Sequence, residues 1–352
     1  MIKVLITEDS PVVRGYLQYV LNSDPDIEVI GIAENGEEAV RMVELNKPDV
    51  VTMDIHMPKM DGFEATRQIM ETNPVPIVIC SASWNPEEVD KTFRTMEAGA
   101  VAALEKPRGM GHPDSEASVR ELLQTIKLMA GVKVVRRWSK ERDRKPAAVS
   151  KAVAEASPKD LPYKAVVMGS STGGPMVLQT ILAGLAKDFP LPIMIVQHIA
   201  PGFLNGLGEW LSRTTNLPVH IASNDEKIKA GQVYLAPDGF QMGIGSGGQI
   251  QLTEGKGEYT LCPSVSHLFQ SALKTYGDRV IGVLLTGMGR DGAEELKTLR
   301  ERGAPTIAQD KESSVVHGMP GEAIKLGGAT YVLSSSNVPK KMMELVVKSA
   351  KK

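Results

Sequence analysis

Apolar and polar positions alternate in blocks along the first part of the chain. Five apolar runs of strand length each precede a segment with the spacing of an amphipathic helix. Strands that alternate with helices in this way predict a parallel sheet covered by helices on both faces. The runs are Val4–Ile6, Val29–Ala33, Val50–Met53, Ile77–Cys80 and Val101–Leu104, and the helical segments are Val12–Leu21, Glu37–Leu45, Phe63–Met70, Glu87–Ala98 and Ser118–Met129.

The pattern stops near Gly131 and resumes near Lys164. The intervening residues are first basic and then rich in Ala, Ser, Lys and Pro, a composition typical of linkers. The segment "GIGSGGQIQLTEG" at residues 243–255 breaks this alternation and predicts a β-hairpin in the second part of the chain. We therefore predict an α/β protein with two doubly wound parallel-sheet domains, 1–125 and 163–352, joined by a linker at 126–162. The apolar runs of the second domain are Ala165–Met168, Ile193–Gln197, Val219–Ala222, Val233–Ala236 and Val280–Thr286.

Composition restricts the classes of partner and the compartment. The 352-residue chain carries a formal net charge of −2, so its overall charge does not favour binding to nucleic acid. Its two cysteines lie far apart in the sequence, which argues against a disulfide framework and favours a reducing compartment. Because no signal pattern or membrane-length apolar run is present, we expect a cytoplasmic protein that does not insert into membranes.

Polar side chains stand at the ends of the strands predicted for the first domain. Glu8 and Asp9 follow the first strand, Asp54 the third, Ser81 the fourth and Lys106 the fifth. In a doubly wound sheet, ligands bind beyond the carboxyl ends of the strands. Three carboxylates at this edge would repel one another unless a cation lay among them, and oxygen ligands of this kind suit Mg²⁺. A hydroxyl and an ammonium group beside them suit a phosphoryl group.

These residues lie in motifs that resemble a known family. The segments "TEDSPVVR", "DVVTMDIHMPKMDG" and "AALEKP" resemble the flavodoxin-like receiver domain of bacterial response regulators. The resemblance implies phosphorylation by a histidine kinase. It also implies the residue roles: Asp54 as phosphoacceptor, Glu8, Asp9, Asp54 and the backbone carbonyl of His56 as Mg²⁺ ligands, Ser81 as switch hydroxyl and Lys106 as the partner of the phosphoryl group. Glu8 replaces the commoner aspartate.

The second domain opens with a glycine-rich turn between a strand and a helix. The turn "GSSTGG" is not a Walker motif, because Pro175 and Met176 stand where that motif needs lysine and a hydroxyl residue. Residues 169–173 instead fit the pattern G-x-S-x-G, which places a nucleophile on a strand-to-helix turn. The middle serine of this pattern is Ser171, and we predict that it is the nucleophile.

A nucleophilic serine needs a base and an orienting acid. His198 directly follows a buried-type strand and so emerges at the same sheet edge as Ser171, whereas His317 is a second, weaker candidate. Asp291 lies in the turn after a later strand and supplies the carboxylate. The order Ser, His, Asp along the chain differs from that of the α/β-hydrolases.

The segment "GMGRDG", Gly287 to Gly292, allows another interpretation. It matches G-x-G-x-x-G, with Asp310 downstream, and could hold a dinucleotide. Against this, the carboxylate of Asp291 would repel a pyrophosphate. The glycines also allow backbone N–H groups to approach a tetrahedral oxyanion, with the amide of Met288 as a donor.

Together these motifs form a second resemblance. "GSSTGG", "VQHIAPGF", "YLAPDG" and the segment that begins "LLTGMGRDG" resemble the catalytic domain of the CheB protein-glutamate methylesterases over residues 163–345. The resemblance implies a Rossmann-like serine hydrolase that demethylates glutamate methyl esters, and deamidates glutamines, on chemoreceptors during chemotactic adaptation. It implies a nucleophile (Ser171), a general base and acid (His198), an orienting carboxylate (Asp291), an oxyanion-hole amide (Met288) and a supporting residue (Thr172).

The two resemblances together imply a phosphorylation-activated enzyme. We expect chemoreceptor cytoplasmic domains as substrate, a histidine kinase as phosphodonor, Mg²⁺ at the receiver, no cofactor for the esterase chemistry, and a monomer. The alternatives are a non-catalytic response-regulator adaptor and the dinucleotide-binding enzyme. The chain departs from the family at Cys262 and Ser266, where Arg and Asp are common, and at His317, where an aromatic residue is common.

Overall fold

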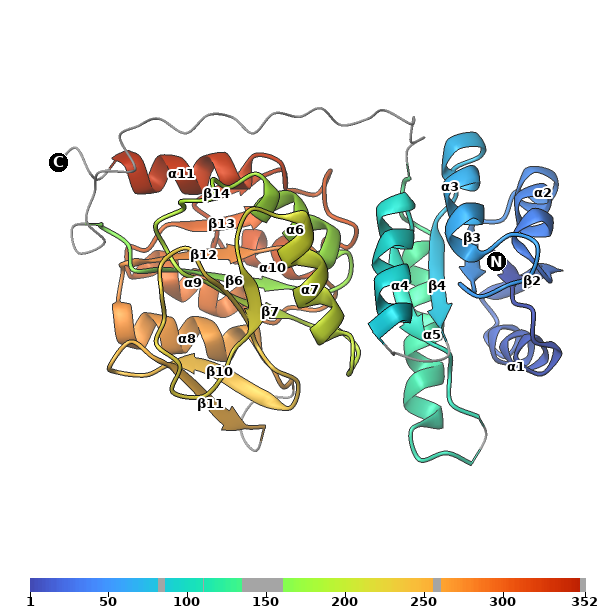
Figure 1. Ribbon diagram of the computed structural model, residues 1–352, viewed down its shortest axis with the longest axis horizontal. Coiled ribbons are helices and arrows are strands. Elements are labelled where there is room, and N and C mark those ends of the chain that lie inside the picture. The colour runs from blue at the N-terminus through green and yellow to red at the C-terminus, as the bar shows by residue number, and fades with distance from the viewer. Residues whose placement is uncertain (82–85, 110, 135–160, 256–260, 349–352) are drawn as a thin grey trace. The chain divides into compact units, whose positions relative to one another are not determined.

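The structure is a computed structural model that describes residues 1–81, 86–109, 111–134, 161–255 and 261–348. The chain divides into two compact units, Met1–Asp143 and Arg144–Lys352. Each unit is built on a parallel sheet with helices on both faces, which confirms the predicted fold class (Figure 1).

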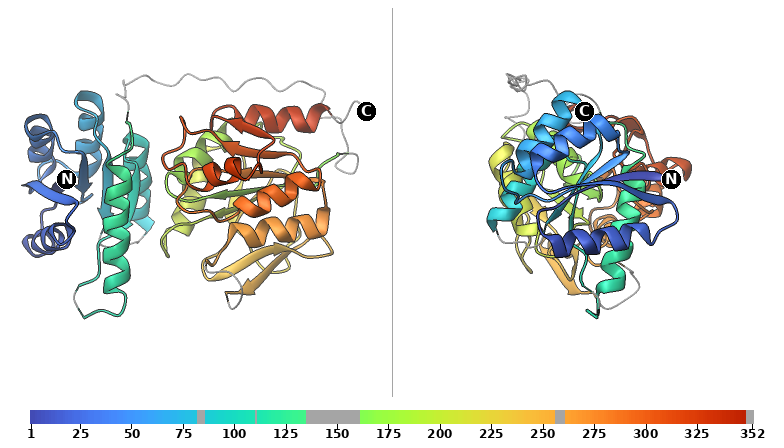
Figure 2. Two further views of the ribbon diagram at one scale, coloured as in Figure 1. Left: turned by 180° about the vertical axis from the view of Figure 1, so that it is seen from behind. Right: turned by 90° about the vertical axis from the view of Figure 1, so that its right-hand side faces the viewer.

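The first unit contains a five-stranded parallel sheet in the order β2-β1-β3-β4-β5. Helices α1 and α5 cover one face of this sheet, and α2, α3 and α4 cover the other (Figure 2). The strand order reverses between β1 and β3, so the carboxyl ends of these two strands flank the switch point. The elements are β1 (Ile2–Thr7), α1 (Pro11–Asn22), β2 (Ile27–Ala33), α2 (Gly36–Asn46), β3 (Val50–Met53), α3 (Gly62–Thr72), β4 (Ile77–Ser81), α4 (Pro86–Ala98), β5 (Ala102–Glu105) and α5 (Ser115–Met129).

Local sequence explains how α3 begins beside the end of β3. The side chain of Asp61 accepts a hydrogen bond from the backbone N–H of Glu64 and caps the helix. A Cβ at Gly62 would overlap the backbone oxygen of Asp54, so only glycine lets the helix start this close to that residue. Strand β3 is buried along its whole length, and Asp54 follows directly after it.

The second unit contains a seven-stranded sheet in the order β14-β13-β12-β6-β7-β9-β8, and every strand pair in it is parallel. The strand order reverses between β6 and β12. The elements are β6 (Ala165–Ser170), α6 (Gly174–Ala183), β7 (Ile193–Gln197), α7 (Leu204–Thr214), β8 (Val219–Ile221), β9 (Val233–Leu235), β10 (Phe240–Ile244), β11 (Ile250–Glu254), α8 (Val265–Tyr276), β12 (Val280–Leu284), α9 (Ala293–Glu301), β13 (Thr306–Gln309), α10 (Met319–Lys325), β14 (Tyr331–Leu333) and α11 (Val338–Lys348).

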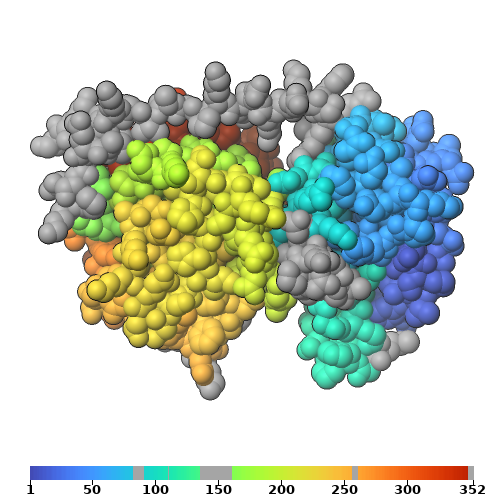
Figure 3. All heavy atoms as spheres, in the orientation of Figure 1, coloured from blue at the N-terminus to red at the C-terminus, as the bar shows by residue number. Residues whose placement is uncertain are grey.

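Two layers of helices enclose this sheet. Helices α6, α7 and α11 lie on one face, and α8, α9 and α10 lie on the other (Figures 1 and 2). In the space-filling view, atoms coloured green through yellow cover much of the visible face of the second unit (Figure 3). The predicted hairpin is confirmed, because β10 and β11 pair as antiparallel strands. Strands β13 and β14 extend the sheet beyond the apolar runs named from the sequence.

Candidate active site and phosphoacceptor site

The turn after β6 carries Ser171 at the switch point of the second sheet. The backbone N–H of Ser171 donates to the carbonyl of Thr286 at 3.0 Å, and its carbonyl accepts from the N–H of Gly174 at 2.8 Å. Gly173 has a φ of +77°, a conformation that glycine adopts without strain. A Cβ at Gly287 would lie 2.7 Å from the Cβ of Ser171, so glycine is needed where the two loops meet. The turn therefore presents a half-buried serine whose backbone N–H and carbonyl are both hydrogen-bonded.

His198 stands one residue beyond β7, the strand that pairs with β6. Ser170 and Gln197 are partners in this pairing, and the N–H of His198 donates to the carbonyl of Ser170 at 2.9 Å. Ser171 and His198 therefore leave adjacent strands at the same level, as predicted. The Nε2 atom of His198 lies 3.0 Å from Oδ2 of Asp291, and both side chains are largely buried.

Asp291 is held by the amino-terminal end of α8. Its carboxylate accepts hydrogen bonds from Oγ of Ser264 and from the backbone N–H groups of Val265 and Ser266, at 3.0, 2.7 and 3.0 Å. Burial alone would raise the pKa of Asp291, but His198, Ser266 and Val265 together lower it to about 2. The side chain is therefore ionised at neutral pH.

Sequence reasoning missed the residues that hold Asp291. Ser264 caps α8, and the hydroxyl of Ser266 donates to Glu295 at 2.6 Å and accepts from the N–H of Gly292 at 3.0 Å. Ser266, singled out as a departure from the family, thus joins α8 to the loop that carries Asp291. The pattern "PSVSHLF", a serine before an apolar helix, is an N-cap signal that could have indicated this position.

The remaining candidates of the second unit lie in or beside the same loops. Thr286 donates its hydroxyl to the carbonyl of Thr172 at 2.9 Å, and the exposed side chain of Met288 follows two residues later. His317 pairs with Gly287 in an isolated bridge, and its Nδ1 lies 3.3 Å from Oγ of Ser314. Its ring thus contacts a serine outside the predicted triad, and burial lowers its pKa.

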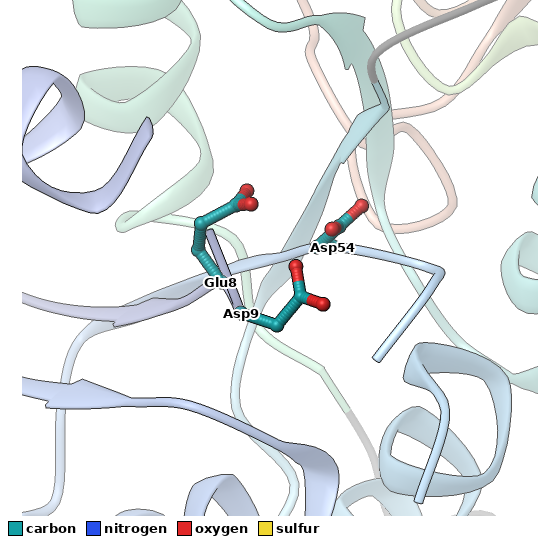
Figure 4. A group of neighbouring side chains, drawn as sticks. All are labelled: Glu8, Asp9 and Asp54. Carbon is teal, nitrogen blue, oxygen red and sulfur yellow. The ribbon is translucent and has the colours of Figure 1, made fainter. Parts of the chain in front are cut away.

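The first unit gathers its acidic residues at the switch point between β1 and β3. Figure 4 shows the carboxylates of Glu8, Asp9 and Asp54 around one common space, and one ligand atom from each lies within 4.8 Å of the others. Nζ of Lys106 lies 2.7 Å from Oε2 of Glu8 and 3.0 Å from Oδ2 of Asp54. The N–H of Ile55 donates to Oδ1 of Asp54 at 2.8 Å.

The charges of this cluster do not balance. Burial raises the pKa of both Glu8 and Asp54, although Lys106 opposes the change. Burial opposes the charged form of Lys106, but its bonds to the two carboxylates raise its pKa. Three carboxylates beside one ammonium group leave excess negative charge on oxygen ligands, which fits a divalent cation such as Mg²⁺. Ser81 is buried at the end of β4, and its carbonyl accepts from the N–H of Lys106 at 2.9 Å, whereas His56 is exposed one residue after Ile55.

The two units belong to recognisable classes. A serine on a strand-to-helix turn, beside a buried histidine–carboxylate pair, is the arrangement of a serine hydrolase. An acidic cluster with a lysine at the switch point of a five-stranded sheet is that of a phosphoaccepting signalling domain. No helix within the described part of the chain is long and apolar enough to cross a membrane.

Comparison with known proteins gives the family. The CheB methylesterase family model matches residues 166–342, and the response regulator receiver domain model matches residues 4–112. The chain belongs to the CheB methylesterase family and carries a receiver domain in front of the methylesterase domain.

Relatives match nearly the whole chain. Protein-glutamate methylesterase/protein-glutamine glutaminase 4 of Geobacter metallireducens is 56% identical, covering 96% of this chain and 97% of its own. The protein-glutamate methylesterase/protein-glutamine glutaminase of Nitrosospira multiformis is 53% identical, covering 98% and 97%. The crystal structure of the Thermotoga maritima CheB methylesterase catalytic domain matches with 41% identity and a TM-score of 0.50, covering 52% of this chain and 99% of that one.

Proposed function

We propose that this protein is a phosphorylation-activated protein-glutamate methylesterase and protein-glutamine glutaminase that acts on the cytoplasmic domains of chemoreceptors. The observation that carries the proposal is the placement of the Ser171 turn beside the His198–Asp291 pair, in a chain whose full-length relatives bear these activities as names. Neither activity nor the receptor substrate is visible in the fold alone, because one fold serves many chemistries.

Ser171 attacks the carbonyl carbon of the glutamate methyl ester, and its hydroxyl proton passes to His198. Because Nε2 of His198 lies against Asp291, Nδ1 is the ring nitrogen that remains to accept this proton. The ionised Asp291 stabilises the imidazolium that forms. The tetrahedral intermediate collapses, the proton of His198 moves to the departing oxygen, and methanol leaves. Water then hydrolyses the acyl-enzyme by the reverse transfers, and a glutamine substrate releases ammonia instead.

The loop after β12 supplies the stabilisation of the oxyanion. In our proposal the backbone N–H of Met288 donates to the negative oxygen of the tetrahedral intermediate. One such donor contributes about 3 kcal/mol to transition-state stabilisation. The support for this role is the position of the loop, since Thr286 in the same loop accepts the N–H of Ser171 and so holds the two segments together.

The receiver unit controls the esterase in this proposal. A histidine kinase donates a phosphoryl group to Asp54, and Lys106 pairs with the new negative charge. Glu8, Asp9, Asp54 and the carbonyl of His56 would hold Mg²⁺, which neutralises charge on the phosphoryl oxygens when bound. Phosphorylation adds nearly two negative charges and three acceptor oxygens, enough to reorder the loops around the site.

Mass spectrometry of methylated receptor peptides tests the proposal. Full-length protein, treated with acetyl phosphate and Mg²⁺, is incubated with peptides that carry glutamate methyl esters and glutamines. We expect loss of methyl groups and deamidation with the wild type, neither with Ser171→Ala, and much slower loss with Asp54→Asn. Ser336→Ala, which changes an exposed serine near α11, is the matched control and should behave as wild type.

The outcomes separate the alternatives. Methyl loss that persists in Ser171→Ala would overturn the assignment of the nucleophile. If wild type and Ser171→Ala release no methanol and both restore signalling in cells in which Asp54→Asn fails, the protein is a response-regulator adaptor and not an esterase.

A further inference from the structure

A buried glutamine connects the nucleophile to the base. Gln197 is the last residue of β7 and is 3% exposed, and Ser170, its partner at the end of β6, is 0% exposed. Each immediately precedes a residue of the predicted triad. Since the two residues are paired in the parallel ladder, their side chains project from the same face of the sheet.

The carboxamide of Gln197 makes three hydrogen bonds. Its Nε2 donates to the backbone carbonyl of Ser171 at 2.9 Å and to that of His198 at 2.7 Å. Its Oε1 accepts from Oγ of Ser170 at 2.6 Å. A single side-chain amide group is therefore attached to both catalytic residues and uses both of its N–H groups to do so.

Ser170 determines the orientation of this amide. The carbonyls of Ser171 and His198 accept hydrogen bonds only, so the nitrogen of Gln197 has to face them. The oxygen then faces Ser170, whose hydroxyl is the donor that it needs. An apolar residue at position 170 would leave a buried carbonyl oxygen without this partner.

The next turn is shaped around the same group. A Cβ at Gly174 would overlap Oε1 of Gln197, so the start of α6 can approach the carboxamide only because this residue is glycine. The N–H of Gly174 in turn donates to the carbonyl of Ser171, the atom that Gln197 also contacts. That carbonyl is thus fixed from two directions.

We propose that Gln197, oriented by Ser170, is a positioning residue that holds Ser171 and His198 at the separation required for proton transfer. This inference rests on the proposed function, since it assumes that Ser171 and His198 react together. Gln197 touches the backbone of both residues and no reacting atom, so its loss lowers kcat and leaves substrate binding unchanged. Ser170 acts only through Gln197.

The test compares four full-length proteins: wild type, Ser170→Ala, Gln197→Met and the double variant. Two rates are measured, methanol release from methylated receptor peptide and covalent labelling of Ser171 by a fluorophosphonate. Labelling needs the activated serine but not the ester substrate. Thermal unfolding of each protein is followed as well. Thr306→Val is the matched control, because Thr306 is a buried hydroxyl hydrogen-bonded at the opposite end of the sheet.

We expect Gln197→Met to lower kcat and the labelling rate about 100-fold with KM unchanged, the scale of a small misplacement of reacting groups. Ser170→Ala should lower both about tenfold, the equivalent of one hydrogen bond left unmade in a buried site. Because both changes act through one amide, the double variant should be no slower than Gln197→Met. Thr306→Val should lose stability and keep wild-type kcat.

Several results would overturn the inference. These are a folded Gln197→Met protein with wild-type kcat, losses that multiply in the double variant, or an equal loss of kcat in Thr306→Val. If Gln197→Met does not fold, unchanged labelling of Ser170→Ala overturns it and slowed labelling supports it. If wild type releases no methanol but shows the expected pattern of labelling, the proposed substrate is wrong and the positioning role stands. If wild type is not labelled at Ser171, both fail.

Discussion

Replacement of Asp291 by asparagine tests whether one carboxylate both caps α8 and orients His198. The pKa of Asp291 falls from 3.8 to about 2, and its side chain is 10% exposed, so solvent screens it little. A difference of about 1.8 units corresponds to about 2 kcal/mol of stability, at 1.36 kcal/mol per unit. Because the folded-state pKa is depressed, this contribution is present above pH 3.8 and is lost as the pH falls toward 2.

Asparagine cannot ionise, so we expect Asp291→Asn to be about 2 kcal/mol less stable than wild type at neutral pH. The deficit should shrink as the pH falls below 3.8, where the wild-type carboxylate also becomes neutral. In the same variant kcat should fall by roughly 10⁴-fold, because the amide no longer selects the productive form of the histidine.

Urea unfolding of the second unit measures the loss of stability. Hydrogen–deuterium exchange of the first turn of α8 reports whether that helix end is weakened. Asp188→Asn, at an exposed position before β7, is the matched control and should exchange as wild type. The reasoning is refuted if Asp291→Asn unfolds and exchanges as wild type at neutral pH, or if its deficit grows as the pH falls through 3.8 to about 2.

Three further predictions concern glycine and metal. Gly174→Ala should lower the free energy of unfolding by about 1–3 kcal/mol and lower kcat, because its Cβ overlaps Oε1 of Gln197; unchanged urea midpoint and kcat would contradict this. Gly208→Ala should stabilise α7 by about 0.5–1 kcal/mol, since its Cβ meets Leu235 at an ordinary 3.6 Å; a lower urea midpoint would contradict it. Removal of Mg²⁺ by EDTA should abolish phosphorylation of Asp54 by acetyl phosphate, followed on Phos-tag gels, without slowing fluorophosphonate labelling of Ser171 in the same sample.

The sheets were predictable where strands are buried on both faces. Strands such as β4 and β7 read as continuous apolar runs, because neither face meets water. Strands β13 and β14 were missed because they are short and partly polar in sequence. β13 begins with Thr306 and ends with Gln309, and β14 is three residues long and partly exposed, so neither has a strong apolar signal. The parallel pairing of β13 with β12, and of β14 with β13, becomes visible only in the folded sheet.

The candidate triad was predictable because Ser171 and His198 directly follow strands and Asp291 lies in the loop after a third strand. His198 was preferred to His317 for its place after a buried strand, and the structure brings His198, not His317, against Asp291. The residues that hold the triad were not predictable in this way. Gln197 read as the last residue of a strand, and Ser264 was not singled out. Gln197 contacts the backbone of Ser171, about 26 residues away in the sequence. Ser264 caps a helix and also donates to Asp291 in another loop. Neither contact can be seen in the local sequence pattern.

Both sites follow from the same rule of sheet topology. In each unit the chain reverses direction across the sheet once, between β1 and β3 and between β6 and β12, and the connections diverge there and leave a crevice. The first crevice collects carboxylates, which need a cation, and the second collects a hydroxyl, an imidazole and a single carboxylate. At the second crevice the backbone ladder aligns Ser170 with Gln197, so a shift of one residue between β6 and β7 would disrupt the glutamine contacts and separate the candidate residues Ser171 and His198. The register of these two strands therefore determines the relative backbone positions of Ser171 and His198 in the candidate site.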